Sequence, residues 1–247
     1  MRDTLKFLIP RKIRKAVRDI LGITALQERV SHLEELLYEA GDGLWEKSRE
    51  RWRESAPTVH LTWGQELSGE SFIQKSSSYD VFGPDKAVLE IGPGYGRLLK
   101  SMVEQNVQFK KYLGLDISEK HVKYLRETFR DSKINFLHAD AENVSFDNGF
   151  DVVLSSLTFK HLFPSFEATL RNVTKYVSPG GLFLFDLIEG KQKHFEFDQN
   201  VVTSLREYTR PEIEEILSRV GLELVAFDEV WHDQEHMRLL VVARKAK

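Results

Sequence analysis

From residue 86 onwards, short apolar runs alternate with amphipathic segments whose apolar positions recur every three or four residues. The apolar runs predict strands over 87–91, 112–117, 134–138, 150–157 and 181–188. The amphipathic segments predict helices over 96–105, 118–129, 165–176 and 210–220. Continuous apolar strands separated by helices are typical of a parallel sheet that is covered on both faces. We therefore expect an α/β fold for this part of the chain.

The end of the chain departs from this alternation. Residues 223–231 and 238–243 read as two consecutive strands, with a short turn over 233–236. This pattern predicts an antiparallel hairpin at the end of the parallel sheet. His232 and His236 lie at the turn, but a hairpin turn does not bring the two rings together as a helical turn does. We expect no metal site there.

The chain divides into an N-terminal helical extension over 1–40, a helical connecting segment over 41–83 and an α/β domain over 84–247. Basic residues crowd positions 1–18. Further along the extension, apolar residues follow the 4-3-4-3 spacing of a short coiled-coil seam: Leu26, Val30, Leu33, Leu37 and Ala40. Three interpretations stay open: packing on the chain's own domain, a homodimer through 26–40, and contact of 1–18 with an anionic membrane face.

The connecting segment carries three tryptophans, Trp45, Trp52 and Trp63. The first two lie seven residues apart, which places them on one face of a predicted helix over 45–53. A second short helix is expected over 66–77. The tryptophans are interpreted either as ordinary core packing or as part of a lid over the glycine-rich loop described below.

Composition excludes several classes of function. The formal net charge of −3 leaves no excess of lysine and arginine to neutralise phosphates, so we expect no nucleic-acid partner. The absence of cysteine excludes disulfides, thiolate metal sites and cysteine nucleophiles. No apolar run approaches the ~20 residues of a membrane-spanning helix, and the N-terminus lacks the apolar core of a secretory signal. We expect a cytoplasmic protein, with membrane association through 1–18 as the open alternative.

The strongest chemical signal is the glycine-rich loop after the first predicted strand. Gly92, Gly94 and Gly96 occupy every second position, and an amphipathic helix follows at once. Glycines allow a ligand to approach the main chain, and the following helix N-terminus offers free N–H groups. A dinucleotide fingerprint would need glycine three residues after Gly94, where Arg97 stands. A nicotinamide-dependent dehydrogenase is therefore the less favoured reading.

Polar residues follow the ends of the next three strands. Asp116 lies about twenty residues past the loop, where a carboxylate can accept from both ribose hydroxyls. Asp140 ends the third strand and can accept from an adenine amino group, while the Ala141 backbone N–H can donate to the ring. Ser155 closes the fourth strand, and His161 lies in the loop beyond it. Parallel strands bind ligands at their carboxyl ends, so these groups should converge.

Taken together, these motifs resemble the class I S-adenosylmethionine-dependent methyltransferases. The resemblance rests on 90–96, Asp116, 138–141, 150–155 and the segment from Leu170 to Gly181. It implies a Rossmann-like, seven-stranded, mostly parallel sheet of order 3-2-1-4-5-7-6 whose last strand is antiparallel, and S-adenosylmethionine as the cofactor. It further implies that Glu90 orders the glycine loop. The expected cofactor-binding residues are Glu90, Gly92, Gly94, Tyr95, Gly96, Asp116, Ile117, Asp140, Ala141 and Ser155.

The acceptor side is less determined. Methylation of an alcohol must remove its proton, and histidine titrates in the right range, so His161 is the expected base. A purely structural histidine is the alternative. Asp186, late on the fifth strand, is the second catalytic candidate, which would orient His161 or contact the acceptor. The stretch 191–200 alternates phenylalanine with charge and is interpreted as a pocket rim or an ordinary edge loop.

We expect O-methylation of a sugar, glycan or small-metabolite hydroxyl. The absence of cysteine excludes cysteine-dependent pyrimidine methylation, and 155–158 lacks the Asn/Asp-Pro-Pro-Tyr/Phe signature of amino-nitrogen methyltransferases. The N-terminal extension is loosely similar to extensions of bacterial glycan-cluster methyltransferases. The alternative is a non-catalytic, cofactor-binding partner module that works through its N-terminal coiled coil.

Overall fold

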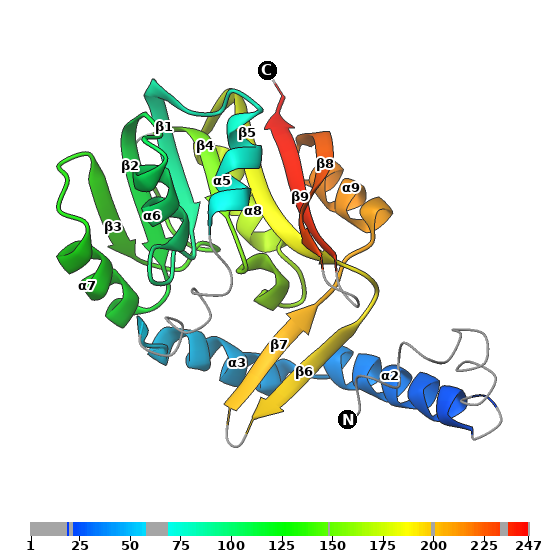
Figure 1. Ribbon diagram of the computed structural model, residues 1–247. Helices are drawn as coiled ribbons and strands as arrows, with labels where there is room; N and C mark the ends of the chain where they lie inside the picture. The colour runs from blue at the N-terminus through cyan, green and yellow to red at the C-terminus, as the bar shows by residue number, and fades with distance from the viewer. Residues whose placement is uncertain are drawn as a thin grey trace, which may run out of the picture.

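The computed structural model describes Asp19 and residues 22–57, 69–147, 149–198, 201–232 and 237–246 (Figure 1). Its helices are α2 (Ile23–Glu39), α3 (Asp42–Glu54), α5 (Glu70–Ser77), α6 (Arg97–Glu104), α7 (Glu119–Thr128), η2 (Phe159–His161), α8 (Glu167–Val173), η3 (Thr174–Tyr176) and α9 (Arg210–Arg219). Its strands are β1 (Gly83–Ile91), β2 (Phe109–Asp116), β3 (Ile134–His138), β4 (Phe150–Ser155), β5 (Val177–Glu189), β6 (Lys193–Asp198), β7 (Val201–Arg206), β8 (Leu222–His232) and β9 (Met237–Lys245).

Seven of these strands form one sheet in the order β3-β2-β1-β4-β5-β9-β8. The first five pair in parallel, and β9 runs antiparallel to both of its neighbours. Since β8 and β9 are the sixth and seventh strands of this sheet along the chain, the order is the expected 3-2-1-4-5-7-6. The expected terminal hairpin is confirmed as well.

The sheet is buried on both faces because its strands carry apolar side chains on both sides. In β1, Leu89 and Ile91 belong to one core cluster, together with residues of α8 and α9. Val88 points to the other cluster, which holds residues of α5, α6 and α7. Figure 1 shows the helices on the two faces accordingly. The α/β prediction, with helices on both faces, is confirmed.

The segment after β5 differs from the prediction. Within this stretch, residues 193–198 form the strand β6, which pairs with β7 in a separate two-stranded sheet that projects from the end of the main sheet (Figure 1). Phe195 and Phe197 are two residues apart in β6 and therefore lie on the same face of the hairpin. Phe195 is 6% exposed, whereas Phe197, nearer the end of β6, is 60% exposed. Phe195 packs with Tyr38 and Val202 in a third, smaller cluster. The hairpin therefore joins the N-terminal helices to the domain.

Helix α2 confirms that the extension is helical over the described part. Of its residues only Tyr38 is buried, whereas the predicted seam is open to solvent, with Leu26 at 63% and Leu33 at 62% exposure. The seam therefore does not pack on its own domain, and pairing with a second copy stays a prediction. The basic stretch 1–18 lies outside the described residues. Within the described part, no helix combines the length and apolar character that a membrane crossing needs.

We expect the core around β1 to dominate stability. Replacing the fully buried Leu89 by alanine removes transfer free energy and leaves a cavity, so Leu89→Ala should lower the free energy of unfolding by about 2–5 kcal/mol. The matched control is Val103→Ala on α6, where the side chain is 53% exposed and the change should stay within about 0.5 kcal/mol. Urea denaturation followed by circular dichroism measures both. Equal losses in the two variants would contradict this account of the core.

Candidate active site

One pocket opens at the edge of the sheet where the parallel strands end. Its wall is built by the loops after β1, β2, β3 and β4, and Figure 1 shows α3 lying across this edge. Most of the predicted site residues are brought together there, as expected from the common direction of the strands. The wall contains Glu90, Gly92, Gly94, Tyr95, Asp116, Ile117, Asp140, Ala141 and His161.

The glycine loop is shaped by residues with positive φ. Gly92 has φ 69°, a backbone conformation that favours glycine. A Cβ at this position would also lie 2.3 Å from Thr158 Oγ1, so a larger residue would clash. Gly94 has φ 59° and open space where a Cβ would be, which leaves room for a ligand against the backbone. Gly96 is different: it precedes α6, packs against Phe129 and is not part of the pocket wall. Its predicted cofactor contact is therefore corrected to a structural role.

Asp116 ties the end of β2 to the glycine loop. Its Oδ2 accepts a hydrogen bond from Gly94 N at 2.9 Å, and its Oδ1 accepts one from Ser118 N at 2.8 Å. The Nδ1 of His121 lies 3.4 Å from Oδ1. The carboxylate thus acts both as a cap of the following turn and as a support of the loop. It still faces the pocket, and each oxygen has capacity for a further donor.

Glu90 supplies a carboxyl group beneath the loop. It is 2% exposed and accepts a hydrogen bond from Tyr112 Oη at 2.5 Å. Burial raises the pKa of Glu90 to about 7, while the Tyr112 hydroxyl and the charge of Arg97 act in the opposite direction. Near neutral pH the group therefore changes protonation readily, and a cation in the pocket would favour its ionised form.

Helix α3 covers the pocket. Trp45, Arg49 and Trp52 come from its inner face and line the pocket wall. Arg49 forms an ion pair with Asp140 and lies 3.3 Å from Glu142. This position agrees with the lid interpretation of the tryptophan helix; Trp63 lies outside the described residues. The spacing of Trp45 and Trp52 predicted that they share one face of a helix, but no sequence signal marked Arg49 as the partner of Asp140.

His161 lies under this lid. Its Nδ1 is 2.8 Å from the backbone oxygen of Ser204. The centres of the Trp52 and His161 rings are 4.7 Å apart. A carbonyl oxygen only accepts, so Nδ1 carries the proton and the lone pair of the neutral ring lies on Nε2. Ser204 is in turn held by a hydrogen bond from its N–H to Ser48 Oγ on α3, at 2.9 Å. The hairpin and the lid together fix this ring.

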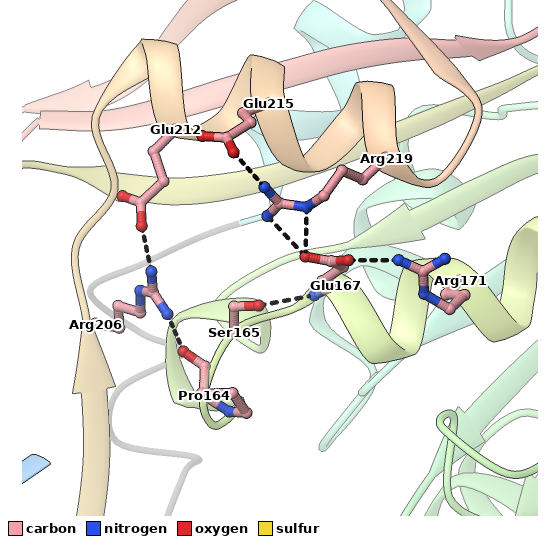
Figure 2. A network of polar contacts seen from close by, with 8 residues as sticks. All are labelled: Pro164, Ser165, Glu167, Arg171, Arg206, Glu212, Glu215 and Arg219. Atoms are coloured by element: carbon pink, nitrogen blue, oxygen red, sulfur yellow. Dashed lines mark hydrogen bonds and ion pairs between the residues drawn. The ribbon is translucent and has the colours of Figure 1, made fainter. Parts of the chain in front are cut away.

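A second network holds the loop that follows His161 (Figure 2). Arg206 at the end of β7 donates to the backbone oxygen of Pro164 and forms an ion pair with Glu212. Glu167 accepts from Arg219 at 2.7 Å, and its backbone N–H donates to Ser165 Oγ at 3.2 Å. These contacts join β7, α8 and α9 around the loop, which limits the positions that His161 can adopt.

Two predicted site residues serve the fold instead. Ser155 is 1% exposed, and its hydroxyl donates to the backbone oxygen of Ile91 at 3.0 Å, so it links β4 to β1 behind the pocket. Asp186 is 3% exposed and lies behind the pocket wall. Its carboxylate accepts from Leu157 N at 2.7 Å, from Ser156 Oγ and from Arg238. It braces the β4 loop rather than meeting the acceptor, which corrects the catalytic expectation.

Sequence reasoning missed the cationic residues beside this brace. Arg97 and Arg238 are 8% and 6% exposed, and both donate to Ser156 Oγ, at 2.5 and 3.2 Å. Arg97, Ser156 and Lys160 line the pocket. Arg97 directly follows the glycine loop, which was a usable signal. No sequence signal distinguished Lys160 from other loop lysines, or Arg238 from other charged residues of the terminal hairpin.

No group of three or more metal-ligating side chains gathers among the residues that the structure describes. The turn at 233–236, which carries His236, lies outside those residues.

Comparison with known proteins identifies the domain. Residues 89–185 match the family described as "Methyltransferase domain". Phthiotriol/phenolphthiotriol dimycocerosates methyltransferase of Mycobacterium tuberculosis is 30% identical over 139 residues, which are 55% of this chain and 51% of the relative. Fatty-acid O-methyltransferase of Mycolicibacterium smegmatis is 34% identical over 107 residues, covering 43% and 38%. The chain thus spans about half or less of these curated relatives.

Solved structures agree on the fold. An S-adenosylmethionine-dependent methyltransferase from Mesorhizobium loti superposes with a TM-score of 0.58 at 20% identity, covering 73% of this chain and 99% of the other. The glycopeptide N-methyltransferase MtfA, solved with S-adenosyl-L-homocysteine, gives a TM-score of 0.60 at 15% identity, covering 76% and 96%. Together with the strand order, these matches show that residues 89–185 carry a methyltransferase domain and that the chain has the fold of S-adenosylmethionine-dependent methyltransferases.

Proposed function

We propose that this chain binds S-adenosylmethionine in the pocket under α3 and methylates a hydroxyl oxygen of a small-molecule, sugar or glycan acceptor. One observation carries the proposal: four successive strand ends contribute their loops to a single pocket. The relatives support the class of reaction, because one is named a fatty-acid O-methyltransferase and the other acts on phthiotriol lipids by its name. Their acceptors are varied, so the hydroxyl acceptor rests on this chain's own residues.

The residues of the wall fit the parts of this cofactor. Asp116 faces the pocket with acceptor capacity to spare, which suits ribose hydroxyls. The open space at Gly94 suits a chain lying against the backbone, and Glu90 suits an ammonium group. Asp140 suits an adenine amino group, with Arg49 neutralising part of its charge. When bound, S-adenosylmethionine supplies a methyl group activated by a positive sulfur.

His161 is the base in this proposal. With its proton on Nδ1, held by the Ser204 carbonyl oxygen, its Nε2 can accept the hydroxyl proton as the new oxygen–methyl bond replaces the sulfur–methyl bond. The packing of Trp52 against the ring keeps water from this side of the pocket and fixes the ring's orientation. The lid therefore contributes alignment, and the histidine contributes proton transfer.

The cofactor proposal predicts a specific loss in binding. S-adenosylhomocysteine should stabilise the protein, and Asp116→Asn should weaken its binding by about tenfold or more, since the hydrogen bonds to a charged acceptor are lost. Isothermal titration calorimetry measures the affinity. Asp85→Asn, on a 77% exposed carboxylate of β1, is the control and should bind as the wild type does. No affinity of the folded wild-type protein would contradict the proposed function.

Glu90 should make cofactor binding depend on pH. Its pKa of about 7 means that below neutral pH a proton must leave before the carboxylate can meet an ammonium group. Affinity for S-adenosylhomocysteine should therefore rise from about pH 5.5 to about pH 8 and then level off. Calorimetry across this range should show a flatter profile for Glu90→Gln, while the surface control Glu104→Gln keeps the wild-type slope. An unchanged slope in Glu90→Gln would assign the pH dependence to another group.

Loss of the base should affect turnover more than binding. With a hydroxyl acceptor found by screening with labelled methyl donor, His161→Asn should lower kcat by about 10²–10⁴. The affinity for S-adenosylhomocysteine should stay within about a factor of two. His32→Asn on α2 is the control. A His161→Asn variant with wild-type kcat would leave the cofactor assignment standing but remove the base.

A further inference from the structure

Two cationic side chains, Arg97 and Lys160, line the pocket, and a third, Arg238, lies behind its wall beside the buried carboxylate of Asp186. Arg97 and Arg238 are held on Ser156, and Arg238 pairs with Asp186. Lys160 lies in the pocket wall next to His161, on the short helix η2. In the part of the chain that the structure describes, no hydrogen bond or ion pair within 4.0 Å occupies the Lys160 ammonium group.

The local charges do not balance. Asp186 already serves Arg238, Ser156 and the Leu157 N–H. Glu90 has a pKa of about 7 and is therefore only partly ionised at neutral pH. Asp186 also attracts Lys160, and Glu196 on β6 attracts it more weakly than Asp186 does. The side chain of Glu196 is 57% exposed. Burial lowers the pKa of Lys160, and the neighbouring Arg238 adds to that effect. A half-buried cation in such surroundings is stabilised by an anion from outside the chain.

The position of Lys160 indicates which molecule brings that anion. The cofactor residues of the proposed function lie on the loops after β1, β2 and β3, whereas Lys160 follows β4 and is the sequence neighbour of the proposed base. Leu162 and Trp52 supply apolar surface beside it in the same wall. An acceptor that places its hydroxyl at His161 would therefore present a neighbouring substituent to the part of the wall that carries Lys160.

We propose that Lys160 binds an anionic group of the methyl acceptor, a carboxylate or a phosphate carried close to the hydroxyl that is methylated. The inference rests on the proposed function and narrows it from any hydroxyl compound to hydroxylated acids. Lysine suits this task because its ammonium group is a compact charge with three donors. Lys160 is then a specificity-determining residue, and His161 keeps its role in proton transfer.

The test compares acids with their neutral counterparts. Protein saturated with S-adenosylhomocysteine is titrated with glucuronate, its methyl ester, glucose 6-phosphate, glucose, 3-hydroxybenzoate and 3-hydroxybenzyl alcohol, and tryptophan fluorescence reports binding. At least one acid should bind about tenfold or more tightly than its neutral counterpart. The carboxylate and phosphate pairs identify which anion is preferred.

Variants of Lys160 test whether this residue causes the preference for acids. Lys160→Met should remove the preference for acids, and Lys160→Arg should retain most of it. Lys123→Met, an exposed lysine of α7, is the matched control and should behave as the wild type. The affinity for S-adenosylhomocysteine should be equal in all four proteins, which also shows that each variant is folded.

Three outcomes would overturn the proposal. They are an absence of any preference for acids in the wild-type protein, a preference that survives in Lys160→Met, and a loss of S-adenosylhomocysteine affinity in that variant. The last would assign Lys160 to the cofactor's own carboxylate. If the wild-type protein does not bind S-adenosylhomocysteine at all, the proposed function itself fails, so the two failures are distinguishable.

Discussion

The buried carboxylate of Asp186 is the interaction on which the active-site side of the molecule depends. A charge with 3% exposure persists only when it is fully paired, and here the loop after β4 and the neighbouring strand β9 contribute the partners. Because Arg238 comes from β9 and Ser156 directly follows β4, the pairing fixes the antiparallel strand to the edge of the sheet that carries the pocket. Through Ser156 it also reaches Arg97, at the start of α6.

A second constraint comes from outside the sheet. Helix α3 closes the pocket, and its end is attached to the domain where the Ser118 hydroxyl donates to the backbone oxygen of Ser55 and Lys120 pairs with Glu54. The hairpin of β6 and β7 supports the other side through Ser204 and Phe195. Since the Lys120–Glu54 pair is exposed, it contributes little to stability on its own. The buried contacts of α3 with the hairpin carry most of the attachment.

Much of this arrangement could be read from the sequence because it depends on local patterns. The apolar runs predicted the strands of the sheet. The alternating glycines of the loop, together with Asp116 and Asp140, predicted the edge of the sheet at which the pocket lies. Ser155 was misassigned by a single position: the side chains of successive strand residues point to opposite sides, so Ser156 rather than Ser155 faces the pocket. The hydrophobic pattern predicts where a strand lies, but it does not determine which residue at the end of the strand points into the pocket.

What the sequence could not supply were contacts between distant segments. Arg49 meets Asp140 across 91 positions, and Arg238 meets Asp186 across 52. Neither pair has a local signature, because an arginine on a helix or at the end of a strand is ordinarily solvated. The hairpin was missed for another reason: a short stretch in which phenylalanine alternates with charged residues also occurs in surface loops.

Because Ser204 holds the His161 ring, the residues that align the proposed base extend beyond the segment that matches the family. The segment that matches the methyltransferase family, 89–185, contains every recognisable motif yet lacks both Ser204 and Ser48. An excised piece with those boundaries would keep its signature loops while losing the scaffold that aligns its imidazole. For the base that we propose, the hydrogen-bond chain from α3 through β7 therefore sets the smallest fragment that keeps this alignment, and the extent of similarity to relatives does not.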